Sequence, residues 1–134
     1  MMFLDSDDVL FPTKVEKQVN YLLAHPDVAI VLCGFRRLDN NGNRIADVYL
    51  DSTRVSVLES ILESGLSGLF PPLVAMIRRD KIPADLRFDE TLPAREEQDF
   101  WLQCAVAQCR FAAQKEILCE FYATPDSRGQ NIDR

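Results

Sequence analysis

The chain begins with a short apolar run, Met1 to Leu4, which ends in a cluster of acidic residues. Such a run is typical of a buried strand that delivers its loop to a site. Pro12 suits the first turn of a helix, where its missing N–H costs nothing. Four apolar residues then follow at helical spacing: Val15, Val19, Leu22 and Leu23. Pro26 ends the pattern, so this region predicts a strand, an acidic loop and a helix.

The strongest strand signal is the continuous apolar run from Val28 to Phe35, which is rich in β-branched residues and typical of a strand buried on both faces. Asp39 to Asn43 is the strongest turn signal in the chain, and we expect a more exposed strand to follow it through Leu50. Two further strands are predicted at Leu73–Ile77 and Ile117–Tyr122.

Two more helices are predicted by apolar spacing. The first is marked by Val57, Leu58, Ile61 and Leu62, and Gly65 closes it. The second begins near Glu96 and carries four residues along one face: Phe100, Trp101, Cys104 and Ala105. Alternating strands and helices indicate an α/β fold, a sheet with helices packed on it. We expect one domain over residues 1–122, followed by a polar, flexible tail over residues 123–134.

Composition narrows the classes of function. The net charge of −6 argues against a nucleic-acid partner, because neutralising phosphates requires a basic surface. The chain has no apolar run near the roughly 20 residues that a membrane span needs, and acids follow Leu4 at once, unlike a secretory signal. We therefore expect a cytoplasmic location, with peripheral attachment to the inner face of a membrane as an alternative.

The first candidate site is the acidic cluster Asp5, Asp7 and Asp8. Two carboxylates one residue apart across a turn can converge on a hard divalent cation that still holds waters and ligand phosphates. Acids before a helix that starts at a proline also favour the positive end of that helix. From spacing alone, the metal site and the helix cap are equally good interpretations.

The wider context distinguishes them. Phe3-Leu4-Asp5-Ser6-Asp7-Asp8, followed by Pro12, Lys14, Glu16 and Gln18, resembles the segment around the DxD motif of family 2 glycosyltransferases, which have the GT-A fold. The resemblance continues in order through Phe88-Asp89-Glu90 and Glu96 to Leu102, and it covers about residues 2–122. It implies that Asp5 contacts the ribose or the metal and that Asp7 ligates Mn²⁺ or Mg²⁺ on the diphosphate of a nucleotide sugar.

The second candidate site is the pair Glu96 and Glu97. Family members usually have Glu-Asp here, and this aspartate is often the base that deprotonates the acceptor hydroxyl in inverting enzymes. Glu97 takes that position, with Glu96 as the alternative, and its longer side chain moves the carboxylate by one methylene. The competing interpretation is that both acids only complement the helix dipole. The resemblance thus implies metal-dependent, inverting transfer of a sugar to a glycan, lipid or other hydroxyl acceptor.

The resemblance begins at the strand before the DxD motif. Complete family members place a nucleotide-binding half before this strand, so the chain corresponds to the C-terminal half of a GT-A domain, a partial Rossmann-like mixed sheet with flanking helices. We expect the isolated chain to be inactive. An unpaired edge at Met1 to Leu4 would also favour self-association.

Two other interpretations stay open. Asp5-Ser6-Asp7-Asp8-Val9-Leu10 resembles the nucleophile loop of haloacid-dehalogenase-like phosphatases, in which the first aspartate attacks phosphorus. Lys81 and Lys115 are available for that chemistry, but no acidic pair follows a lysine in the expected order. The last interpretation is a non-catalytic remnant that serves as an association module.

Overall fold

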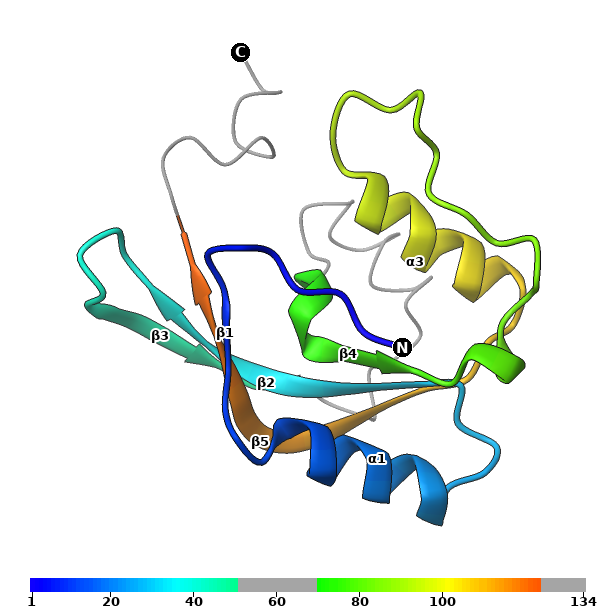
Figure 1. The fold of residues 1–134 in the computed structure, drawn as a ribbon, viewed down its shortest axis with the longest axis horizontal. Coiled ribbons are helices and arrows are strands. Elements are labelled where there is room, and N and C mark those ends of the chain that lie inside the picture. The colour runs from blue at the N-terminus through cyan, green and yellow to red at the C-terminus, as the bar shows by residue number, and fades with distance from the viewer. Residues whose placement is uncertain (51–69, 124–134) are drawn as a thin grey trace.

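A computed structural model describes residues 1–50 and 70–123 of the chain. Within these residues, five strands form one mixed sheet, and two α-helices flank it (Figure 1). The predicted α/β class with a partial Rossmann-like mixed sheet is confirmed. The helix expected around Val57 to Leu62 and the tail from residue 124 onward lie outside the described residues.

The sheet is built around β2 (Ile30–Leu38). On one side β2 pairs in parallel with β5 (Phe111–Tyr122) over its whole length. On the other side it pairs antiparallel with β4 (Ala75–Ile77) near its start and with β3 (Arg44–Val48) near its end. The short β1 (Val9–Leu10) pairs antiparallel with β5 and forms the outer edge of the sheet.

The two helices cover opposite faces of this sheet (Figure 1). Side chains alternate between the faces of a strand, so Val31 of β2 packs with Leu22 of α1 (Lys14–Ala24). Its neighbour Leu32 lies in the other cluster with Trp101 of α3 (Glu96–Val106). No helix within the described ranges is long and apolar enough to cross a membrane.

Two short 3₁₀ helices flank β4. The first, η3 (Pro72–Val74), replaces the beginning of the strand predicted from Leu73 to Ile77. The second, η4 (Arg79–Lys81), follows the strand directly. Pro72 at the first position of η3 suits the start of a helical turn, and this turn takes up Leu73 and Val74, which shortens the strand.

The strand predicted at Met1 to Leu4 does not form, but the segment begins beside β4, in the predicted sheet. The terminal ammonium of Met1 donates to the Ile77 carbonyl, and the Ile77 N–H donates to the Met1 carbonyl, both at 2.7 Å. Hydrogen bonding to β4 ends with this Met1–Ile77 pair, so residues 1–4 do not form a strand. Phe3 instead packs its ring against Phe100 of α3, which draws the segment off the sheet edge.

β5 begins six residues earlier than predicted. The segment from Phe111 to Glu116 contains Ala, Gln, Lys and Glu, which favour helix locally, yet it extends along β2. Pairing with the buried central strand outweighs that propensity. The register shifts on both sides of Gly34, where an added Cβ would lie 2.8 Å from the Val48 carbonyl oxygen, so this close approach of strands requires glycine.

The orientation of α1 differs from the one its apolar spacing suggests. Lys14 and Gln18 are 0% exposed, whereas Val15, Val19 and Leu23 are 46%, 39% and 70% exposed. The spacing correctly predicts a helix, but of its four apolar residues only Leu22 is buried against the sheet.

Hydrogen bonds explain how two polar side chains are buried. The Lys14 ammonium donates to Gln18 Oε1, and Gln18 Nε2 donates to the carbonyls of Val31 and Val74, at 3.2 and 2.9 Å. Burial lowers the pKa of Lys14, and the nearby Cys33 and Cys119 thiols partly oppose this shift. Gln18 therefore connects α1 to β2 and to the end of η3, because its amide serves all three partners.

Gln18→Leu should destabilise the fold. The substitution keeps the side-chain volume but leaves two buried carbonyls and the Lys14 ammonium without this partner. We expect the free energy of unfolding to fall by about 1–3 kcal/mol in urea titrations. The control Asn20→Ala, on the exposed face of α1, should change it by less than about 0.5 kcal/mol. Equal effects of the two substitutions would contradict a structural role for Gln18.

Candidate functional site

The acidic loop, Asp5–Asp8, lies between the segment Met1–Leu4 and β1. A turn forms it, closed by the Asp8 N–H donating to the Asp5 carbonyl at 3.3 Å. Asp5 and Asp7, the two residues predicted to bind metal, are both exposed, and Asp8 is half-buried. Because β1 follows at once and pairs with β5, the end of the loop is held against the sheet.

Asp8 fastens the loop to the C-terminal end of β5. One of its carboxylate oxygens accepts a hydrogen bond from the Tyr122 backbone N–H at 3.4 Å. Burial raises the pKa of Asp8 to about 6, the hydrogen bond opposes this rise, and the charges of Asp7 and Asp5 add to it. Asp8 thus supports the loop, while Asp5 and Asp7 remain accessible.

Aromatic contacts hold the start of the loop against α3. The ring of Phe3 makes edge-to-face contacts with Phe88 and Phe100, at centroid distances of 5.1 and 5.6 Å. Phe88 and Phe100 stack on each other at 4.9 Å. Such pairs contribute about 0.5–1.5 kcal/mol beyond the area they bury. Since Phe100 is one turn after Glu97, this cluster sets where the loop lies relative to the second acidic pair.

Glu96 and Glu97 occupy the first turn of α3. The helix begins after Arg95, which adopts a left-handed backbone with φ of 67°, and whose carbonyl accepts hydrogen bonds from the Gln98 and Asp99 N–H groups. Burial raises the pKa of Glu97, and the charges of Glu96 and Asp5 raise it further. The contacts of Phe3 with Phe88 and Phe100 bring the acidic loop near this first turn, although the two are far apart in sequence.

The donor set fits a hard divalent cation only in part. Within residues 1–50 and 70–123, no three His, Cys, Asp or Glu side chains converge to hold a metal. Asp5 and Asp7 supply exposed carboxylate oxygens, and Mg²⁺ is often held in proteins by one or two carboxylates together with water and substrate phosphates. Any cation held here would therefore depend on a phosphate ligand for much of its coordination.

Two residues of α3 near Glu97 stabilise the fold. Trp101 is fully buried in the core. The Asp99 carboxylate accepts a hydrogen bond from Gln103 Nε2 at 2.5 Å, and the same amide donates to the Arg87 carbonyl. Sequence reasoning overlooked Phe3 as the residue that links the acidic loop to α3. The sequence signal for this role is an aromatic residue two positions before Asp5, together with the aromatic residues Phe88 and Phe100 near the second acidic pair.

Comparisons with known proteins identify distant relatives of this chain. No protein-family model matches the chain. An uncharacterized glycosyltransferase of Methanocaldococcus jannaschii is 25% identical over 88% of the chain, and uncharacterized glycosyltransferases of Rickettsia bellii and Rickettsia felis are 30% and 28% identical over 75% and 94% of it. The matching regions cover 40%, 15% and 21% of these relatives, so the chain spans less than half of each. The similarity supports a relationship to glycosyltransferases in general.

Asp8→Asn should stabilise the protein at neutral pH. The raised pKa of Asp8 means that the folded state binds its proton more tightly than the unfolded state, so the wild type loses stability as pH rises from about 4 to 6. Asparagine has no charge to bury and can still accept from Tyr122. At pH 7 we expect a gain of about 1 kcal/mol, less than the full shift implies because water screens the carboxylate.

Urea titrations at pH 4 and pH 7 would measure this gain. The difference between Asp8→Asn and wild type should be small at pH 4 and larger at pH 7. Asp85→Asn, a substitution of an exposed carboxylate outside the acidic loop, is the matched control. A gain that does not depend on pH would contradict the burial of an ionised Asp8.

Proposed function

We propose that this chain is the part of a metal-dependent glycosyltransferase that holds the diphosphate of a nucleotide sugar and activates the acceptor hydroxyl. One observation carries the proposal: Phe3, two residues before Asp5, packs its ring against Phe100, one turn after Glu97, so the acidic loop lies beside the start of α3. Two acidic groups with different tasks are thereby brought to one place. The names of the three relatives support transferase chemistry over the phosphatase alternative.

In this proposal Asp5 and Asp7 hold Mn²⁺ or Mg²⁺, as the resemblance of the loop to the DxD motif of family 2 enzymes with the GT-A fold implies. Bound there, the cation would neutralise negative charge on the diphosphate leaving group. The exposure of both carboxylates suits this role, because donor phosphates must reach the same cation. The hydrogen bond from the Tyr122 N–H to the Asp8 carboxylate holds the end of the loop against β5.

Glu97 is the proposed general base, with Glu96 as the alternative. A base must be ionised and must also accept a proton readily, and a raised pKa increases the second property. Its place in the first turn of α3 and the contact of Phe100 with Phe3 support a position of this carboxylate beside the loop. Deprotonation of the acceptor hydroxyl opposite the leaving diphosphate would give an inverting reaction, and the acceptor would be a glycan, a lipid or another hydroxyl compound.

Metal binding tests the acidic loop. Mn²⁺ should bind the wild-type chain weakly in calorimetry, and UDP should strengthen this binding because its phosphates complete the coordination. Asp7→Ala should abolish the effect without changing the melting temperature, since Asp7 is exposed. Asp85→Ala should retain it. Identical Mn²⁺ titrations for wild type and Asp7→Ala would refute the assignment of Asp7.

Turnover tests Glu97. The isolated chain should transfer almost no sugar from common nucleotide sugars, and joining it to a matching N-terminal half should restore transfer. In that longer protein, Glu97→Gln should lower kcat by about 10²–10⁴-fold, the typical contribution of a general base, while donor Kd stays nearly constant. Glu96→Gln is the matched control and should have a much smaller effect. Robust turnover by the isolated chain would contradict the need for a further half.

A further inference from the structure

One exposed side of α1 is apolar. Val15, Val19 and Leu23 follow one another at intervals of four residues, so they form one stripe along the helix. Each is more than a third exposed, while the adjacent side of the helix buries Lys14 and Gln18. A surface helix normally has the reverse arrangement. Burying three such side chains would be favourable by roughly 25 cal/mol per Å² of apolar surface.

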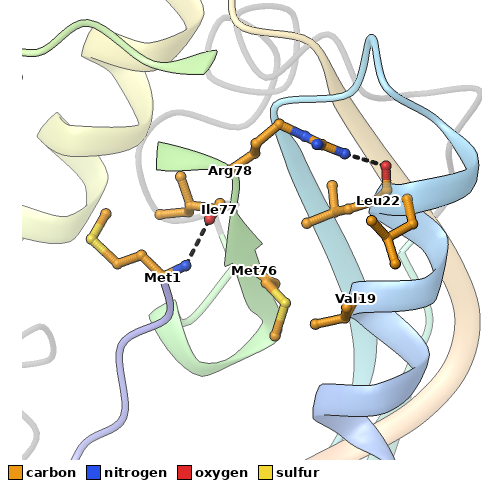
Figure 2. Close-up of a pocket in the computed structure, with 7 residues that line it drawn as sticks. Met1, Val19, Leu22, Met76, Ile77 and Arg78 are labelled. Carbon is orange, nitrogen blue, oxygen red and sulfur yellow. Dashed lines mark hydrogen bonds between the residues drawn. The ribbon is translucent and has the colours of Figure 1, made fainter. Parts of the chain in front are cut away.

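A shallow apolar groove continues this stripe toward the sheet. Its volume is about 230 Å³, and it lies between α1, β4 and the first residue of the chain (Figure 2). Val19 and Leu22 form one wall, and Met1 and Met76 form the other side. We call the stripe and this groove together the α1 surface. Val19 belongs to both parts, so the α1 surface is continuous.

Charges of opposite sign mark the two ends of the α1 surface. Glu16 is exposed next to Val15, near the N-terminal end of the helix. Arg78 lines the groove near the C-terminal end, where its guanidinium donates to the Leu22 carbonyl (Figure 2). Among the ion pairs of residues 1–50 and 70–123, none involves Glu16 or Arg78.

We propose that the α1 surface binds a second copy of this chain, with the two α1 helices antiparallel about a twofold axis near Val19. A twofold contact brings the same patch of each copy together, so a stripe of apolar residues meets its own copy. The antiparallel arrangement also places Glu16 of each copy opposite Arg78 of the other. This charge complementarity at both ends favours a second copy over a partner of unspecified sequence.

Sedimentation velocity over a concentration series tests the association. Wild type should form dimers, and Val19→Glu and Leu23→Glu should each raise the dimer Kd by at least about tenfold, because each buries a charge in the contact. Both positions are exposed in the single chain, so the circular dichroism spectra and melting of dilute samples should not change. Ile45→Glu and Val106→Glu, substitutions of exposed apolar residues elsewhere, are matched controls and should dimerise like wild type.

A charge exchange tests the antiparallel geometry. Glu16→Arg and Arg78→Glu should each weaken self-association several-fold, because each places like charges together at both ends of the contact. An equimolar mixture of the two variants should associate about as well as wild type, since both ends then pair opposite charges. Thermal melts of each variant alone would verify that Arg78→Glu stays folded despite the lost bond to Leu22. A mixture no tighter than its components would refute the proposed orientation.

Two further results would overturn the proposal as a whole. One is a wild-type chain that remains monomeric up to about 100 μM, which would put any dimer Kd above the micromolar range. The other is association that persists in Val19→Glu and Leu23→Glu but is lost in Met2→Pro. This substitution removes the backbone N–H of the residue that directly follows the Met1 pair with Ile77. That pattern would assign self-association to the sheet edge beside Met1 instead.

Discussion

Parallel pairing of β2 with β5 is the interaction on which the other elements depend. The first part of β2 is fully buried, and its alternating side chains supply one core cluster for α1 and another for α3. β5 also carries β1 on its outer edge, and β1 is the direct continuation of the acidic loop. The position of that loop therefore follows from a strand pair whose members are separated by most of the chain.

The candidate site combines a charged surface with an aromatic support. Asp5 and Asp7 face solvent, whereas Asp8 binds the Tyr122 backbone and Phe3 contacts Phe100. These two attachments fix the loop on both sides of the exposed carboxylates. A site that must admit a charged ligand requires such support, because its own acidic residues repel one another.

Polar burial in α1 has a consequence on the adjacent side of the helix. Gln18 and Lys14 are satisfied by one hydrogen-bond network that reaches the carbonyls of two other elements. With this face turned inward, Val15, Val19 and Leu23, each one position after a buried residue, lie on the adjacent, exposed side of the helix. The unusual core and the exposed apolar stripe are thus two results of a single helix orientation.

The sequence by itself determined the α/β class, the central strand, the helices at α1 and α3, and the acidic cluster, because these depend on local periodicity and composition. It did not reveal the six-residue extension of β5, the inward face of α1 or the departure of Phe3 from the sheet edge. Each of these depends on contacts with partners distant in sequence, which outweigh local propensity. The position of the acidic loop beside α3 is of the same kind, since only the tertiary structure packs Phe3, near the start of the chain, against Phe100.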